Sequence, residues 1–206
     1  MNPTFVNIHT HRPTGRGIEL RTAGIHPWEA EKLPADAALQ ALEAELNRGD
    51  AQAIGEIGLD YAVAVDRTAQ QELFRAQLTL ARLRQLPVIL HCVKAFEETM
   101  RLLAKQEPRA VIFHGFIGSP QQARRATERG YYLSFGERTF ASPRTVEALR
   151  STPLSHLFLE TDESTTPIET IYTRAAELSG HDIETLKQAT TENYRRIFCE
   201  QSERNG

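Results

Sequence analysis

Short apolar runs alternate with segments of helical periodicity along most of the chain. Runs rich in Val, Ile, Leu and Phe are typical of buried strands, and apolar residues spaced three or four apart are typical of helices. The runs predict strands at residues 6–11, 18–25, 53–57, 87–91, 110–114, 131–135 and 157–160. The periodic segments predict helices at residues 34–48, 68–84, 96–105, 120–129 and 143–150, and two more that are separated at Gly180. This alternation predicts an α/β fold with a largely parallel sheet.

Turn and capping residues mark several of the predicted helix ends. Gly49 and Gly130 follow two helical segments, where a left-handed residue commonly ends a helix. Ser142 and Pro143 suit the N-cap and first position of another helix. Thr68 is followed three residues later by Gln71, which predicts a capping box at the start of the helix over 68–84.

The connection between the first two predicted strands is too short for a helix. Residues 12–17 are rich in turn formers and span at most about 20 Å when extended. A parallel crossover normally needs a dozen or more residues. We therefore expect this connection either to run back antiparallel or to cross in an extended form, with no helix between His11 and the strand at 18–25.

Histidines and carboxylates recur at the ends of the predicted strands. His9 and His11 are two residues apart on a strand, so their side chains point to the same face and could bind one divalent cation. Alone, such a pair is more often a surface feature. Four later strands also end in a candidate ligand, and strand ends converge at one face of a parallel β/α barrel. The full set suits two divalent ions that share a carboxylate, with Glu56 as the natural bridge: His9, His11, Glu56, His91, His114 and Asp162.

Composition limits the class of protein and its partners. The chain has 206 residues, of which 40% are hydrophobic, enough for one sizeable core, and we expect a single domain over residues 1–206. The formal net charge of -3 argues against broad contact with duplex nucleic acid. Cys92 and Cys199 suggest no disulfide framework, and neither a leader nor a long apolar run is present. We expect a cytoplasmic protein with no membrane contact and no obligate protein partner.

Ordered motifs over nearly the whole chain resemble those of the TatD-related metal-dependent hydrolases and deoxyribonucleases, which belong to the amidohydrolase-like barrels. The stretch over residues 55–61 is the most specific of them. The matching segments are Asn7-Ile8-His9-Thr10-His11, Gly24-Ile25-His26-Pro27-Trp28, Gly55-Glu56-Ile57-Gly58-Leu59-Asp60-Tyr61, Pro87-Val88-Ile89-Leu90-His91-Cys92, His114-Gly115-Phe116, Ser134-Phe135-Gly136, Leu159-Glu160-Thr161-Asp162 and Thr191-Glu192-Asn193-Tyr194.

The resemblance implies a TIM-like (β/α) barrel of the metal-dependent hydrolase type and a set of roles. One ion would be held by His9, His11, Glu56 and Asp162, and the other by Glu56, His91 and His114. Zinc, magnesium and manganese are all admissible. Asp162 would also orient or deprotonate the attacking water. His26 would lie near the substrate phosphate, although a loop histidine bonded to the backbone fits its position nearly as well.

Three departures from the family pattern affect these expectations. Asn7 stands where the family usually has an aspartate, which removes a charge near the metal ligands. Val93 stands where an arginine is common, so that Lys94 is at best a point-charge substitute for a bidentate phosphate clamp. The segment between His11 and Gly24 is much shorter than in the family. We therefore expect an incomplete or seven-stranded barrel.

The leading functional hypothesis is a two-metal phosphodiesterase, a TatD-like deoxyribonuclease that trims nucleic-acid ends. Lys94, Arg12 and Arg138 would supply positive charge for a few nucleotides, and the alternative for Lys94 is a side chain in water at the start of a helix. Trp28 and Phe116 could stack on a base, or serve only in packing. Two other hypotheses stay open: hydrolysis of a small amide, lactone or phosphate ester, and a catalytically weak metal-binding protein.

Overall fold

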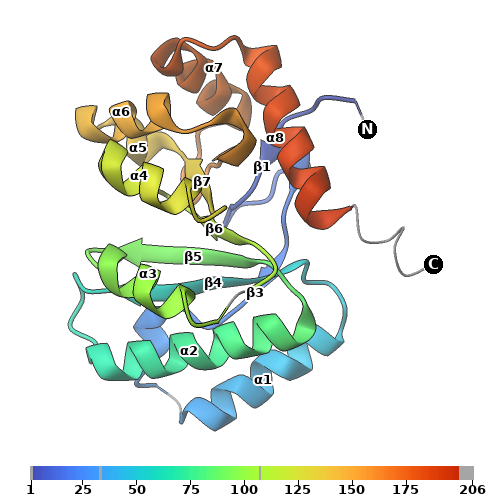
Figure 1. Cartoon of the computed structure of the whole chain (residues 1–206). Helices are drawn as coiled ribbons and strands as arrows, with labels where there is room; N and C mark the ends of the chain where they lie inside the picture. Colours follow the sequence, from blue (N-terminus) through green and yellow to red (C-terminus); the bar gives the residue numbers. More distant parts are fainter. Residues whose placement is uncertain (1, 33, 107, 200–206) are drawn as a thin grey trace. The chain divides into compact units, whose positions relative to one another are not determined.

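The chain folds into two compact units. The computed structural model describes residues 2–199, except residues 33 and 107 (Figure 1). Unit 1 combines Met1–Leu20 with His114–Gly206, and unit 2 is Arg21–Phe113. Unit 1 therefore joins the start of the chain to its second half. Each unit is described below by itself.

Unit 2 is a four-stranded parallel sheet with helices packed on it. Its strands follow the order β3, β4, β5, β6, and each pair is parallel. In Figure 1, α1 and α2 run along one side of these strands. The strands are β3 (Thr22–Ala23), β4 (Ala53–Asp60), β5 (Val88–Val93) and β6 (Val111–Phe113). The helices are the 3-10 helix η1 (Pro27–Glu29), α1 (Ala35–Asn47), α2 (Arg67–Arg84) and α3 (Phe96–Leu103).

Strand β4 is longer and less regular than the sequence predicts. Ile54 pairs with Val88 and Ile57 with Leu90, so three steps along β4 match two along β5 and one extra residue is accommodated in a bulge. The strand then continues to Asp60. The prediction that the strand ends at Ile57 is therefore wrong, because the apolar pattern continues through Leu59. In the same way, β5 continues past His91 to Val93.

Unit 1 contains two pairs of parallel strands joined by backbone hydrogen bonds. Strand β1 (Val6–Asn7) pairs with β2 (Ile18–Glu19), and β7 (Tyr132–Phe135) pairs with β8 (Leu157–Leu159). The chain after β1 lies beside β8, because Ile8 N–H donates to Leu159 O at 3.2 Å. The helices are α4 (Pro120–Thr127), α5 (Glu137–Phe140), α6 (Pro143–Ser151), η2 (Leu154–His156), α7 (Ile168–Ser179) and α8 (Ile183–Phe198).

The connection over residues 12–17 crosses between parallel strands without a helix. The parallel pairing of β1 with β2 confirms the extended crossing and excludes the antiparallel alternative. Gly17 has φ +77°, and a Cβ there would lie 2.3 Å from Phe5 O, so the turn requires glycine. The predicted strand over 18–25 is divided into two short strands. Strand β2 belongs to unit 1 and strand β3 to unit 2.

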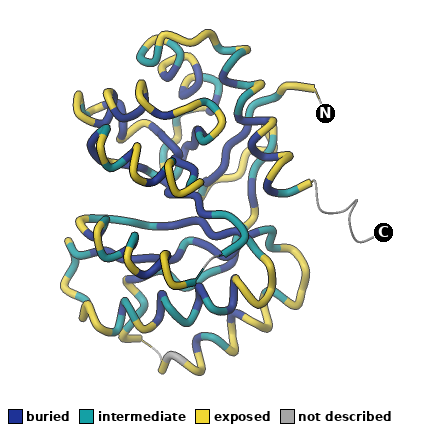
Figure 2. Tube along the Cα trace, viewed as in Figure 1, coloured by how far each residue is buried: buried dark blue, intermediate teal, exposed yellow. Residues whose placement is uncertain are grey.

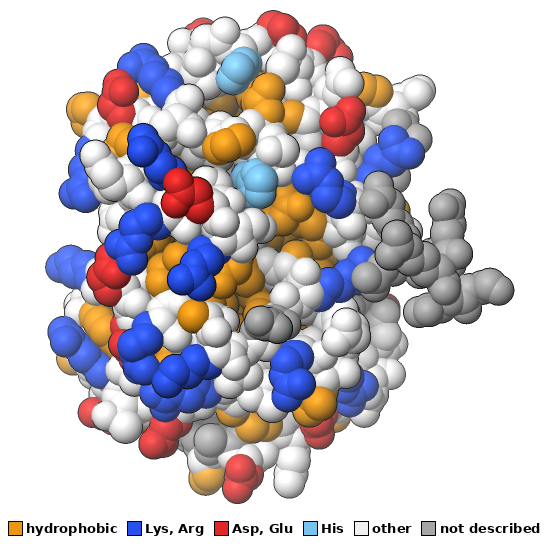
Figure 3. All heavy atoms as spheres, viewed as in Figure 1, with side chains coloured by type: hydrophobic (Ala, Val, Ile, Leu, Met, Phe, Trp, Pro, Cys, Tyr) orange, Lys and Arg blue, Asp and Glu red, His pale blue; other side chains and the backbone are white. Residues whose placement is uncertain are grey.

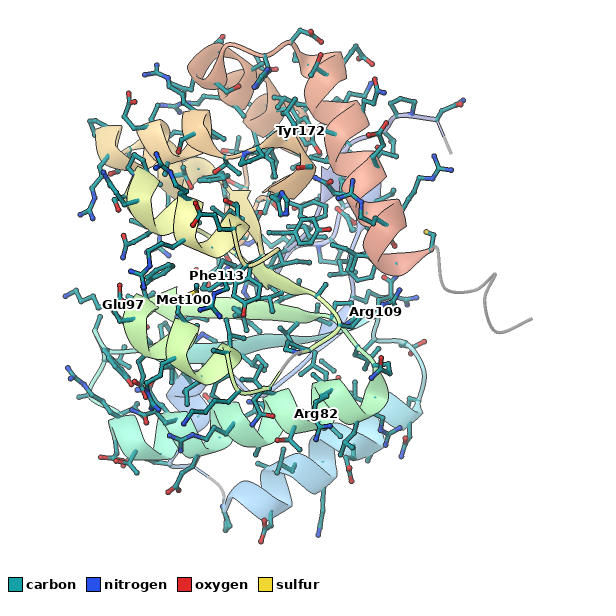
Figure 4. All side chains as sticks on the ribbon, viewed as in Figure 1. Arg82, Glu97, Met100, Arg109, Phe113 and Tyr172 are labelled. Carbon is teal, nitrogen blue, oxygen red and sulfur yellow. The ribbon has the colours of Figure 1, made fainter. Side chains whose placement is uncertain are left out.

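The core of unit 1 is organised around Tyr172 on α7. Its ring is fully buried, and its hydroxyl donates to Val6 O at 3.0 Å. The same oxygen accepts from Val6 N–H at 3.0 Å and lies 2.7 Å from Thr190 Oγ1 on α8. Figure 2 shows buried residues along the strands, and Figure 4 labels Tyr172. One hydroxyl thus connects β1, α7 and α8.

The boundaries of the predicted helices agree with those of the structure to within two residues. Ser142 caps α6 as predicted, accepting from Thr145 N–H. The predicted capping box at Thr68 is wrong, because Asp66 is the N-cap of α2 and accepts from Ala69 N–H at 2.8 Å. The short α5 was not predicted. No helix among the described residues has the length and apolar character needed to span a membrane.

Candidate metal centre

Unit 1 brings together four of the predicted ligands. His9 and His11 follow β1, and the Nε2 atoms of both approach Asp162 Oδ1, at 3.7 Å and 3.5 Å. The rings of His9 and His114 have centroids 4.4 Å apart. One ligand atom each from His9, His114 and Asp162 lie within 4.8 Å of one another. Three residues distant in sequence therefore present imidazole and carboxylate donors to one point, as a divalent cation requires.

The backbone positions this group. Asp162 N–H donates to His9 O at 3.1 Å, and His11 N–H donates to Asp162 O at 3.0 Å. Asp162 adopts a left-handed backbone conformation, with φ +54°. The two backbone hydrogen bonds join the segment over residues 9–11 to Asp162, where the candidate ligands meet. A non-glycine residue in this conformation is uncommon and often marks a functional position.

A buried carboxylate supports His114. Glu160 Oε1 lies 3.2 Å from His114 Nδ1 and accepts from Gly115 N–H at 2.7 Å. Burial alone would raise the pKa of Glu160, but the electrostatic attraction and hydrogen bond of His114 hold it below its usual value. His114 therefore favours the carboxylate form of Glu160. Such a partner orients a ligating imidazole and makes the other ring nitrogen more basic.

The hydrogen bonds of Asn7 account for an amide at the position where the family usually has an aspartate. Asn7 Nδ2 donates to Thr161 Oγ1 at 2.9 Å, and Asn7 Oδ1 accepts from Thr161 N–H at 3.0 Å. Thr161 Oγ1 in turn donates to Thr10 Oγ1 at 2.9 Å. An ionised aspartate could accept but could not donate to Thr161. The amide therefore fits this buried network, which lies directly before Asp162.

Unit 2 holds a second group around His91. Its Nδ1 lies 2.6 Å from Glu56 Oε1, and its Nε2 lies 3.0 Å from Asp60 Oδ2. His26 Nε2 is 3.5 Å from the same Glu56 oxygen. Ligand atoms of His26, Glu56 and His91 lie within 4.8 Å of one another. Two imidazoles and a carboxylate in this arrangement suit zinc or manganese better than magnesium, which prefers oxygen ligands.

Asp60 is the residue of this group that the sequence predictions missed. It is buried and accepts from the indole N–H of Trp28 at 2.8 Å and from Ala62 N–H at 2.9 Å. Burial would raise the pKa of Asp60, but these bonds together with His91 hold it below its usual value. Gly58, two residues before Asp60, has φ +141°, and a Cβ there would lie 2.0 Å from His91 O, so this position requires glycine. The place of Asp60 in the motif over residues 55–61 was visible in the sequence, but its partners Trp28 and His91 were not.

His26 has the backbone hydrogen bond that one of its two interpretations from sequence requires. Its Nδ1 accepts from Trp28 N–H at 3.3 Å, so it is bonded to the backbone at the start of η1. Its Nε2 faces Glu56. A role at the substrate phosphate stays a prediction.

The predicted substrate contacts lie on the surface. Lys94 follows β5, is exposed, and has φ +52°. Arg12 is exposed and lines a pocket of about 450 Å³ in unit 1, and Arg138 is exposed on α5. Phe116 is buried, with its ring centroid 5.8 Å from that of Phe135, so it packs in the core of unit 1. Trp28 is half exposed, although its indole nitrogen is bonded to Asp60.

Comparison with known proteins decides the family. A family model described as TatD related DNase matches residues 18–199. The chain belongs to this family. Among TatD relatives, the Escherichia coli protein named "Uncharacterized metal-dependent hydrolase YjjV" is 39% identical over 152 residues, covering 70% of this chain and 58% of its own. The "3'-5' ssDNA/RNA exonuclease TatD" of Cronobacter turicensis is 37% identical over 148 residues, covering 68% of this chain and 56% of its own.

Solved TatD structures confirm the fold. The crystal structure of Escherichia coli YjjV has a TM-score of 0.79 at 31% identity and covers 87% of this chain and 76% of its own. A TatD family hydrolase from Entamoeba histolytica has a TM-score of 0.76 at 18% identity, covering 88% and 75%. The predicted α/β fold of the TatD type is thereby confirmed. The chain spans 58% and 64% of the lengths of two curated relatives, YjjV and the Bacillus subtilis protein YabD.

The two ligand groups, together with relatives named metal-dependent hydrolases, support the use of divalent metal by this TatD protein. The assignment of individual ligands stays a prediction. The same holds for the sharing of Glu56 by two ions, which joins residues of both units.

Proposed function

We propose that this TatD protein is a metal-dependent phosphodiesterase that trims single-stranded nucleic-acid ends. The observation that carries the proposal is the presence in each unit of imidazole and carboxylate donors close enough to hold a cation. Bound divalent ions would polarise the phosphodiester and lower the pKa of the attacking water. Support for the substrate comes from the Cronobacter turicensis relative named as a ssDNA/RNA exonuclease.

The chain's own residues have separate roles in this proposal. His9, His11, His114 and Asp162 serve as ligands in unit 1, and Glu56 and His91 serve as ligands in unit 2. Asp162 accepts the proton of the attacking water, because its Oδ1 lies 3.7 Å and 3.5 Å from the Nε2 atoms of His9 and His11, at the ligand group itself. Glu160 and Asp60 orient His114 and His91 through their hydrogen bonds.

Substrate contacts are confined to a few nucleotides. The formal net charge is -3, and on the face shown in Figure 3 Lys and Arg side chains alternate with Asp and Glu. A chain with this net charge differs from the strongly basic domains that usually bind long duplexes. Lys94 and Arg12 are exposed and supply local positive charge, and His26 offers an imidazole to the phosphate. End trimming therefore fits better than cleavage within a long duplex.

The test is hydrolysis of end-labelled single-stranded DNA and RNA by the full-length protein loaded with manganese, zinc or magnesium. We expect stepwise shortening that chelator abolishes, and a fall of about 100-fold or more for Asp162→Asn and Glu56→Gln. Glu163→Gln is the matched control, because Glu163 is exposed beside Asp162. Turnover of a small neutral ester or amide with no action on oligonucleotides would overturn the nuclease proposal. Activity that survives both substitutions would overturn the proposed site.

A further inference from the structure

A pocket in unit 1 has a composition suited to an anion. Its volume is about 450 Å³, and two loops form it, residues 12–17 and 161–167. Arg12, Thr14 and Arg16 come from the first loop, and Thr161 and Thr165 from the second. Two guanidinium groups and several hydroxyls line it, and no carboxylate is among the lining residues. Arginine forks and hydroxyl donors are the groups that recognise phosphate.

The positive charge of this pocket is not neutralised by close ion pairs. Within the described residues, Arg12 forms no ion pair with a carboxylate. Arg16 Nη1 lies 3.8 Å from Glu169 Oε1, and their side chains are 66% and 38% exposed. An ion pair this long and this exposed contributes little and is readily exchanged for a better anion. Both guanidiniums are thus available to a ligand.

Two neighbouring carboxylates, Glu19 and Glu137, stabilise the two loops that form the pocket. Glu19 accepts from the N–H groups of Thr14 and Gly15, both at 2.8 Å. Glu137 accepts from the hydroxyls of Ser164 and Thr166, and these bonds, the Ser164 bond first, lower the pKa of Glu137. Each loop is therefore held in place before any ligand arrives, which reduces the entropy cost of binding.

The pocket adjoins the ligand group of unit 1. Arg12 directly follows His11, and Thr161 directly precedes Asp162, and both line the pocket. The candidate ligands His9, His11, His114 and Asp162 are not among the lining residues, so a phosphate bound here would be a different one from the phosphodiester that is cleaved at those ligands. Both arginines lie on the short connection between the parallel strands β1 and β2.

We propose that the pocket between residues 12–17 and 161–167 is a subsite for a second, uncleaved phosphate group of the substrate, held by Arg12 and Arg16. The inference rests on the proposed function for the identity of the ligand, a single-stranded oligonucleotide. It adds Arg16 to the residues that bind substrate. It also adds a length requirement, because a substrate with only one phosphate cannot occupy the subsite and the cleavage site at the same time.

The experiment is a binding measurement, so it does not depend on hydrolysis. A fluorescent five-nucleotide DNA with cleavage-resistant phosphorothioate linkages is titrated with the full-length, metal-loaded protein. We expect the double variant Arg12→Gln/Arg16→Gln to bind about tenfold more weakly, with the salt slope reduced by about 0.7 per lost phosphate contact. Arg129→Gln is the control, because Arg129 is an exposed arginine of unit 1 that does not line the pocket. It should bind as the wild type does.

A second arm locates the phosphate. Each linkage in turn is replaced by a neutral methylphosphonate, and affinities of wild type and double variant are compared as a double-mutant cycle. We expect one linkage whose neutralisation weakens the wild type about tenfold and the double variant less than twofold. Equal losses at every linkage, or unchanged affinity of the double variant, would overturn the subsite. If the subsite is found but the same protein cleaves no cleavable oligonucleotide, the proposed function fails and the subsite stands.

Discussion

Substitution of Glu160 tests whether a residue that contacts a candidate ligand, without being one, affects metal binding. Glu160 is fully buried and contacts His114 Nδ1 without belonging to the ligand group. Glu160→Gln keeps the shape but removes the charge, so we expect metal affinity to fall about 10- to 100-fold while the fold is retained. Competition with a chelating dye measures the affinity, and circular dichroism checks the fold. Unchanged affinity, with Glu163→Gln as the control, would show that Glu160 only packs.

The two cysteines should differ strongly in reactivity. Burial raises the pKa of the Cys92 thiol to about 11, and its Sγ lies 3.5 Å from Thr99 Oγ1. Cys199 is exposed. Because the thiolate is the reactive form, a thiol whose pKa is raised in this way reacts slowly at pH 8. We expect a thiol-reactive dye at pH 8 to label Cys199 quickly and Cys92 only after unfolding. Fast labelling of Cys199→Ser would contradict this.

At the residue scale, sequence reasoning found the candidate ligands but not the groups that contact them. His9, His114 and Asp162 meet as their places after strands predict. Asp60 was missed because a polar residue at the end of an apolar run gives no sign that Trp28 and His91 will bond to it. Asn7 was read as a lost charge, whereas its amide donates a bond to Thr161 that a carboxylate could not. Such partners depend on tertiary contacts.

At the element scale, the start of α2 gives a direct test of capping. Asp66 accepts from Ala69 N–H, whereas Thr68 lies inside the helix. Asp66→Ala should lower the free energy of unfolding by about 1 kcal/mol, because a backbone N–H loses its acceptor. Thr68→Ala should change it little, since alanine has the better helix propensity. Urea unfolding of both variants measures the difference. A larger loss for Thr68→Ala would restore the capping box predicted from sequence.

Strand and helix positions were predictable where one apolar pattern continued without interruption. The helices α2, α6 and α8 follow their periodicity. The bulge in β4 was not predictable, because the register of a strand depends on its partner β5 and not on its own pattern. The helix α5 has only four residues, too few to show a period.

At the scale of the whole molecule, the missing crossover helix was the most useful prediction from length alone. Residues 12–17 cannot hold a helix, and the parallel pairing of β1 with β2 shows the extended crossing that results. The division of the chain after Leu20 and after Phe113 was not predicted. No composition shift or linker marks these points, because the units are defined by contacts between distant segments.

Metal content is the measurement that tests the central claim most directly. The full-length protein is equilibrated with manganese or zinc, freed of excess by gel filtration, and analysed for bound metal. We expect about two ions per chain in the wild type, and a lower content in His114→Ala of unit 1 and in His91→Ala of unit 2. Each variant should keep its secondary structure. A wild type that retains no metal, or variants that both retain the wild-type content, would contradict the assignment of these groups as metal ligands.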